Sequence, residues 1–439
     1  MADTTVDAVL GLLGAPDRLE ELVTALGELN DRGRRKISAR VRSLAEQVRW
    51  NDDSRAVSLA ALGCVTGVRQ LAAALDAAPI RSDQTELAVR VLVKREPHWL
   101  TDLAVALLVR SEPRAEHFQL VRALVREGAV ARPEFPEYLE AMVWGLSPDL
   151  PPSTVFDQLR ADPDLLDDEL WDLLATERVG RGLTYHDNFH LKPQHWGSGE
   201  PPPPRPEATW QHALTVLAAD GTLDRNRLID AALGAFFRDW AAADVAWFVG
   251  LHGALSPTEQ ELVARQATYS RLLAAEHGPV VKLGLATLRT LLASGHLDVD
   301  LLLASAPAPL ARPNKGTVST TLGLLSDVAA AQPDSAERVA EVVATAVQHE
   351  RVDVQERAIA LLTTLVPDAD QRLQLLEPFT EGLAPSLRPP CAPVRVEDPT
   401  GPTLSEPDPL IVPVRDADEL GELFARLSGV HQGGVRRPR

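Results

Sequence analysis

Three histidines and an aspartate lie close together near the middle of the chain, and they are the residues best suited to chemistry. His186 and His190 are four residues apart, Asp187 lies between them, and His195 follows five residues later. Two histidines at this spacing share one face of a helix, as a zinc site on a helix requires. No Glu follows the first histidine, so the pattern is not that of a metalloprotease. A metal-dependent enzyme that uses these histidines is one hypothesis.

The sequence around the histidines favours a different interpretation. Residues 180–207 contain Gly180, Gly182, Gly197 and a run of four prolines at 201–204, and they show no helical period. This composition is typical of an exposed loop or linker. We therefore expect the histidines to lie in a mobile, solvent-facing loop without a metal, and we expect no cofactor and no catalytic residue in the chain.

A basic run near the N-terminus is the candidate for an anion site. It contains Arg34, Arg35, Lys36 and Arg40 in a predicted helix. Nucleic-acid sites combine such a face with aromatic side chains that stack on bases, and only Trp50 lies nearby. The run is therefore expected to be a solvated helix face that pairs with acidic residues, with an anion face as the alternative.

Two further candidates have simpler structural interpretations. His252 lies between apolar residues, so we expect a core histidine with a satisfied hydrogen bond. Arg225 and Arg227 are followed by Asp230 and preceded by Asp224, which favours ion pairs between repeats over an anion clamp.

Composition limits the classes of function. The formal charge of the 439-residue chain is −18, and an acidic surface of this size repels nucleic acid and anionic lipid. Cys64 and Cys391 lie far apart and predict no disulfide framework, and Cys64 is expected in the core. The N-terminus has no basic region typical of a signal peptide, and no apolar run is long enough to span a membrane. We expect a cytoplasmic protein.

The elements that position these residues are predicted to be helices. Apolar residues make up 45 per cent of the chain, aromatic residues only 5 per cent, and Ala, Leu and Val dominate, which favours close helix packing. Residues 280–295, 317–332 and 353–368 are apolar runs of helical period spaced 37 and 36 residues apart, with a second helical run between neighbours. This spacing predicts an all-α fold, an α-solenoid of HEAT-like antiparallel helix pairs. Leu288, Leu325 and Leu361 should occupy equivalent buried positions.

The expected domain organisation has six parts, and the helical repeats are less regular in the first than in the third. They are a degenerate helical repeat at 1–180, a Gly/Pro-rich loop at 181–207, a HEAT-like repeat domain at 208–384, a Pro-rich tether at 385–415, a short amphipathic helix at 416–429 and a basic tail at 430–439.

Several motifs between Trp210 and Val366 resemble those of a known family. They are W-x-x-A-L at Trp210–Leu214, G-x-L-D-R-x-R-L at Gly221–Leu228, F-F-R-D-W at Phe236–Trp240 and L-H-x-x-L-x-P-T-x-x-E at Leu251–Glu261. Together with the D-x-D-E-L at Asp416–Leu420, they resemble an uncharacterised family of bacterial, mostly actinobacterial, proteins with HEAT-like repeats. The resemblance extends over about residues 208–420. It implies a helical repeat fold and no assigned activity, and relatives that continue past Leu420 imply a missing C-terminal part.

The leading hypothesis is a non-enzymatic scaffold that binds a protein or peptide partner on its concave face. The predicted tail helix carries an apolar stripe suited to a helix-in-groove contact, formed by Leu420, Leu423, Phe424 and Leu427. The alternatives are a nucleic-acid-binding HEAT-like protein, which the charge disfavours, and the metal-dependent enzyme.

Overall fold

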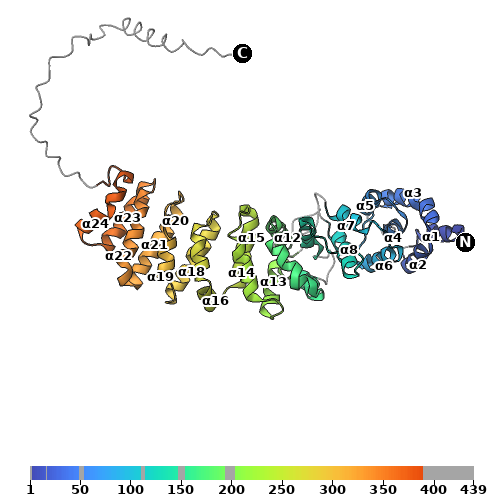
Figure 1. Cartoon of the computed structure of the whole chain (residues 1–439), viewed down its shortest axis with the longest axis horizontal. Coiled ribbons are helices and arrows are strands. Elements are labelled where there is room, and N and C mark those ends of the chain that lie inside the picture. The colour runs from blue at the N-terminus through green and yellow to red at the C-terminus, as the bar shows by residue number, and fades with distance from the viewer. Residues whose placement is uncertain are drawn as a thin grey trace, which may run out of the picture. The chain divides into compact units, whose positions relative to one another are not determined.

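The structure is a computed structural model that describes residues 2–15, 17–48, 54–109, 114–146, 154–192 and 203–388. The regular structure in these ranges is helical throughout, without a β-strand, so the prediction of an all-α protein is confirmed. One compact unit, Met1–Ala384, contains nearly all of these residues, and a second unit comprises Pro385–Arg439. Helices follow one another through the first unit in chain order, from the blue N-terminal helices to the red α24 (Figure 1).

The N-terminal helices enclose one helix that is buried along almost its whole length. They are α1 (Ala2–Leu12), α2 (Leu19–Glu28), α3 (Asp31–Val48), α4 (Ser54–Cys64), α5 (Val68–Ala77), α6 (Thr85–Arg95), α7 (Leu100–Leu108) and α8 (Ala115–Arg126). Helix α4 contacts α2, α3, α5 and α6, and all of its residues except Arg55 are buried. Its small side chains allow this close approach, since a Cβ at Gly63 would lie 2.8 Å from the Leu26 side chain. Cys64 is buried here as predicted, and burial raises the pKa of its thiol to about 12.

The middle helices include one, α12 (Val179–Leu191), that extends into the first part of the region expected to be a loop. They are α9 (Pro136–Gly145), α10 (Val155–Ala161), a π-helical turn (Leu165–Glu169), α11 (Leu170–Ala175), α12, α13 (Trp210–Ala219), α14 (Arg225–Ala235) and α15 (Ala242–Leu255). Helix α12 packs on α9 and α15, α10 on α13, and α11 on α14. These contacts join the helices on either side of residues 193–202.

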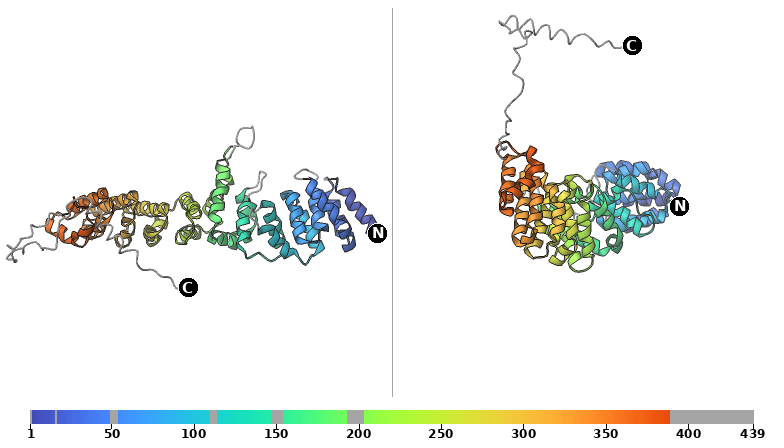
Figure 2. Two further views of the ribbon diagram at one scale, coloured as in Figure 1. Left: turned by 90° about the horizontal axis from the view of Figure 1, so that it is seen from above. Right: turned by 60° about the vertical axis from the view of Figure 1, so that its left-hand side comes forward.

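The C-terminal helices of the unit lie in two rows. They are α16 (Glu259–Ala264), α17 (Gln266–Arg271), α18 (Gly278–Ala293), α19 (Val299–Ser305), α20 (Pro307–Leu310), α21 (Lys315–Ala331), α22 (Ala336–Ala344), α23 (Val352–Leu365) and α24 (Ala369–Leu376). Helices α15, α18, α21 and α23 contact each other in this order, and so do α17, α19, α22 and α24. Figure 2 shows this part of the chain from green-yellow to red.

Short polar side chains define where several of these helices begin. Asp224 accepts a hydrogen bond from the backbone nitrogen of Arg227 at 3.1 Å, and Asn314 accepts one from that of Thr317 at 3.0 Å. Each side chain satisfies an N–H group that has no partner inside its helix. Gly221, at φ 81°, lies in the turn between α13 and α14, where a left-handed residue ends the first helix.

The three leucines chosen from the sequence differ in burial. Leu288 on α18 and Leu325 on α21 are fully buried, whereas Leu361 on α23 is partly exposed. The expectation that Leu361 occupies an equivalent buried position is therefore wrong. The three helices begin 37 residues apart, at Gly278, Lys315 and Val352. The residue of α23 that corresponds to Leu288 and Leu325 is therefore Leu362, which is fully buried, so the 36-residue spacing expected for the last pair is one residue too short.

Candidate functional site

The two described histidines of the central cluster lie on a helix and not in a loop. Helix α12 begins at Val179, directly after Arg178, whose φ is 73°. His186 and His190 are one turn apart, and their ring centroids are separated by 4.8 Å. The expectation of a solvent-facing loop is therefore wrong here, because His186 is completely buried. Tertiary packing stabilises a helix that its sequence alone would form poorly.

The close packing of α12 depends on Gly180. A Cβ at this position would lie 2.0 Å from the backbone oxygen of Asp244 on α15, so only glycine fits. The buried carboxylate of Asp244 also accepts a hydrogen bond from the backbone nitrogen of Arg181 at 2.9 Å. This bond satisfies an N–H group in the first turn of α12. Helix α12 is thereby fixed against α15 at its N-terminal end.

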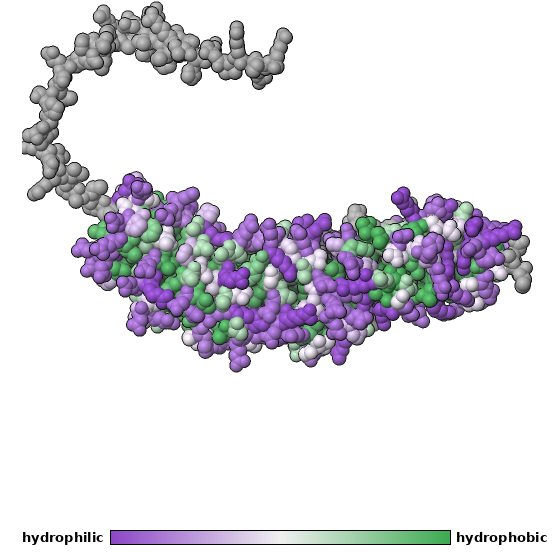
Figure 3. Space-filling model, in the orientation of Figure 1, coloured by the Kyte–Doolittle hydropathy of each residue, from purple (hydrophilic) through white to green (hydrophobic). Residues whose placement is uncertain are grey.

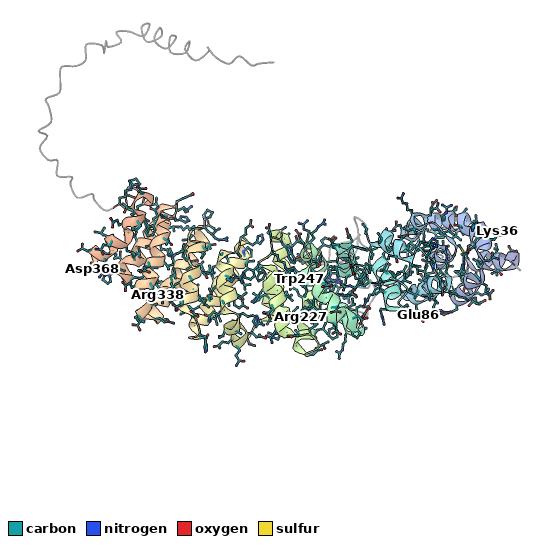
Figure 4. All side chains as sticks on the ribbon, viewed as in Figure 1. Lys36, Glu86, Arg227, Trp247, Arg338 and Asp368 are labelled. Atoms are coloured by element: carbon teal, nitrogen blue, oxygen red, sulfur yellow. The ribbon has the colours of Figure 1, made fainter. Side chains whose placement is uncertain are left out.

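The carboxylate of Asp187 fixes the N-terminus of α13 in the same way. It is buried, and it accepts hydrogen bonds from the backbone nitrogens of Trp210 at 2.7 Å and Gln211 at 3.3 Å. It also accepts one from the indole nitrogen of Trp247 at 2.9 Å, a side chain that is labelled in Figure 4. A negative charge at a helix N-terminus is favoured by the helix dipole. Asp187 thus joins α12, α13 and α15, and both of its oxygens are engaged.

His186 lies between this carboxylate and the ring of Trp144. Its Nδ1 is 3.4 Å from Asp187 Oδ1, and its ring centroid is 5.3 Å from that of Trp144. Its Nε2 is buried without a hydrogen-bond partner in the described part of the chain. Burial, and then the neighbouring His186, lower the pKa of His190 to about 4, so His190 is neutral at pH 7.

Imidazoles are potential metal ligands, but the described residues bring only two of them together here. Within the ranges that the structure describes, no three His, Cys, Asp or Glu side chains are arranged to hold a metal ion. His195, the third candidate, lies outside these ranges. The geometry of the cluster is that of a structural joint between four helices, α9, α12, α13 and α15.

His252 and Arg225 have the structural roles that their sequence context predicts. His252 is buried on α15, with its Nε2 2.7 Å from the hydroxyl of Tyr269 on α17, which confirms the expected core histidine. The guanidinium of Arg225 binds Glu261 at 2.7 Å and the backbone oxygen of Leu255 at 2.7 Å. Its partner is thus on another helix and not Asp224.

The remaining predicted residues are not brought into a common site. Arg35, Lys36 and Arg40 lie on the exposed side of α3, and Arg34 pairs with Asp31 at 3.3 Å (Lys36 is labelled in Figure 4). The buried side of α3 carries Ile37, Val41 and Ala45. The tail residues Leu420, Leu423, Phe424 and Leu427 lie outside the described ranges.

A buried ionic cluster beside the π-helical turn was not predicted. Arg122 on α8 donates to Asp162 through two nitrogens at 2.7 Å and to Glu169 at 2.5 Å, and all three are buried. The hydroxyl of Tyr138 on α9 donates to Glu169 at 2.8 Å. Burial of charges requires such complete pairing. The partners are 40 and 47 residues from Arg122, so no local sequence pattern could indicate them.

A groove crosses the row formed by α2, α6 and α8. Its main part, about 790 Å³, is lined by Val23, Thr24, Thr85, Glu86, Val89, Arg90, Val93, Lys94, Ala123, Arg126 and Glu127. An adjoining hollow of about 220 Å³ shares Thr85, Ala123 and Arg126 with it and extends to Asp162 after α10. Figure 4 labels Glu86 on this side, and Figure 3 shows apolar residues between hydrophilic ones in the same part of the unit.

A second hollow, of about 960 Å³, lies over α18 and α21. Lys282, Leu285, Ala286, Arg289 and Thr320 are among the residues that line it. This hollow lies between neighbouring helices of one row, and the groove over α2, α6 and α8 lies between neighbouring helices of another. Each is formed where successive helices pack.

Exposed aromatic side chains on α12 form another unpredicted feature. Tyr185 is 66 per cent exposed, Phe189 47 per cent and Leu191 40 per cent. The sequence shows that these residues are apolar, but their exposure depends on which face of α12 is covered by α9 and α15.

A family model described as a domain of unknown function (DUF6493) matches residues 19–316, about two thirds of the chain. The match begins well before the region in which motifs were recognised in the sequence. No curated protein matches the chain. In the part of the chain that the structure describes, no helix is long and apolar enough to cross a membrane.

Proposed function

The chain belongs to the DUF6493 family, and we propose that this protein is a non-enzymatic α-solenoid scaffold that binds a protein or peptide partner. In this proposal, HEAT-like helix pairs stack along the chain, and the partner binds along the concave face. The groove over α2, α6 and α8 is part of that face. The proposal rests on this groove, because the groove crosses three successive helices of one row.

Hydrogen bonds between successive helix pairs support the repeat. His277 Nε2 is 2.9 Å from the backbone oxygen of Trp240, 37 residues earlier. Arg312 donates to the backbone oxygen of Glu276 at 3.1 Å, 36 residues earlier, and His349 Nε2 is 3.1 Å from that of Arg312, 37 residues earlier. Each bond joins one pair to the preceding pair at its end. A stack in which each unit contacts only its neighbours exposes long faces to partners.

The groove has the chemistry of a peptide site. Val89 and Val93 form apolar parts of its lining, and Arg90, Lys94 and Glu86 supply charges of both signs. An extended peptide could place apolar side chains against the valines and polar groups at the edges, as interfaces with an apolar centre and a polar rim do. The overall charge of −18 disfavours nucleic acid as the ligand.

A matched pair of substitutions tests this proposal. Val93 lies in the groove and is 39 per cent exposed, whereas Val105 lies on α7, outside the groove lining, and is 41 per cent exposed. We expect Val93→Arg to remove partners that co-purify with the tagged full-length chain from its native cells, and Val105→Arg to retain them. Quantitative mass spectrometry of the three samples makes the comparison. Equal recovery of all partners with both variants would contradict the proposal, and so would the absence of any specific partner.

A further inference from the structure

The exposed aromatic side chains of α12 form a continuous patch with Trp144 on α9, here called the aromatic patch. It consists of Trp144, Tyr185 and Phe189. The ring of Trp144 lies 5.6 Å from that of Tyr185 and 6.3 Å from that of Phe189, edge to face in both cases. Apolar side chains that gather on a surface in this way mark interaction sites, whereas scattered ones do not.

The patch is held on a rigid support. The opposite face of α12 carries Gly180 in contact with α15 and the carboxylate of Asp187, which binds α13 and Trp247. The two aromatic residues of α12 are therefore fixed by the same helix whose buried side joins four helices. Aromatic side chains presented in this way lose little conformational entropy on binding, which favours tight contacts.

Basic residues border the patch. Arg181 is exposed one helical turn before Tyr185, and Lys192 is exposed three residues after Phe189. The backbone nitrogen of Arg205 donates to the backbone oxygen of His190 at 2.8 Å, and the guanidinium of Arg205 pairs with Glu207 at 3.3 Å. The one acidic residue within α12 is Asp187, and it is buried. A protein with a charge of −18 thus presents a basic, aromatic stripe at this position.

We propose that the aromatic patch is a docking site for an acidic linear segment of a partner protein. Apolar anchor residues of the segment pack on Tyr185, Phe189 and Trp144, and its carboxylates approach Arg181 and Lys192. Aromatic residues framed by cations also suit single-stranded nucleic acid, but its phosphates would be repelled by the rest of this acidic chain. A short carboxylate-bearing segment is held at the local cations and gains specificity from its apolar anchors.

This site is separate from the groove of the proposed function and does not depend on it. The patch lies on α9 and α12, whereas the groove lies on α2, α6 and α8. Val93→Arg is expected to leave the patch intact, and substitutions in the patch are expected to leave the groove intact. The two proposals can therefore fail independently.

The test is fluorescence anisotropy with the full-length protein and a short labelled peptide in which Asp and Glu alternate with Leu and Phe. We expect Tyr185→Ala combined with Phe189→Ala to weaken binding by about tenfold or more, as for interface residues that carry most of the affinity. Arg181→Glu combined with Lys192→Glu should weaken it similarly. Raised salt should weaken binding to the wild type, because part of the attraction is between charges near the surface.

Two controls make the result decisive. Phe237→Ala removes another exposed phenylalanine, 40 per cent exposed and outside the patch, and should leave the affinity unchanged. A peptide with Asn and Gln in place of Asp and Glu should bind at least tenfold more weakly. Equal binding of the two peptides, or an equal loss with Phe237→Ala, would overturn the proposal. Tighter binding of a labelled oligothymidylate than of the acidic peptide would also overturn it and would assign the patch to nucleic acid.

Discussion

His252 is an imidazole that the fold keeps neutral. It is 3 per cent exposed, its Nε2 contacts the Tyr269 hydroxyl, and burial lowers its pKa to about 4, against an ordinary value of 6.5. Because the folded-state pKa lies below that of the unfolded chain, His252 contributes stability above pH 6.5. This contribution is lost as the pH falls from 6.5 towards 4.

We therefore expect the free energy of unfolding to fall less steeply between pH 6.5 and pH 4 in His252→Gln than in the wild type. The difference should be on the order of 3 kcal/mol, because the pKa of His252 falls from 6.5 in the unfolded chain to about 4 in the folded protein. Denaturant unfolding at several pH values measures it. Parallel curves for the two proteins would show that the titration of His252 is not linked to folding.

Single residues also show how far the sequence determines the candidate site. The core role of His252 followed from its apolar neighbours. The burial of His186 did not, because it depends on Gly180 meeting α15, 64 residues further along the chain. Local chemistry is predictable from a sequence, whereas contacts between distant segments are not.

At the scale of helices, α18, α21 and α23 were predicted from their apolar period, and they begin 37 residues apart at Gly278, Lys315 and Val352. The sequence failed at α12, whose glycines and neighbouring prolines resemble a loop. Its buried face is set by α9 and α15. Helices with strong internal periodicity can be predicted, whereas one held by its neighbours cannot.

The same three helices yield a prediction about packing. Leu288→Ala and Leu325→Ala should each lower the free energy of unfolding by ~2–5 kcal/mol, because each leaves a cavity in a closed core. Leu361→Ala should cost only about 1 kcal/mol, since its side chain is partly exposed and leaves no enclosed cavity. Chemical denaturation of the three variants tests this order. An equal cost at Leu361 would indicate that its face is covered in solution.

At the scale of the whole unit, the helices before and after the central joint are connected by contacts of α10 with α13, of α11 with α14 and, on both sides, of α12. The contacts of α12 with α9 on one side and α15 on the other continue the packing from the N-terminal helices to the later ones. In chains of stacked elements, stability is close to a sum of local terms and contacts between neighbours. A substitution at this joint should therefore destabilise the helices next to it more than distant helices.

Gly180→Ala tests this expectation, because the new Cβ would lie 2.0 Å from the backbone oxygen of Asp244 and force α12 and α15 apart. Gly234→Ala on α14 is the control: nothing lies within 4 Å of its Cβ, so helix propensity should stabilise this variant by up to about 1 kcal/mol. Hydrogen exchange should become faster in α12 and α15 of Gly180→Ala, while α3 and α21 keep their wild-type protection. Uniformly faster exchange along the chain would mean that the unit unfolds as one cooperative body, and that contacts between neighbours do not limit the effect of the substitution.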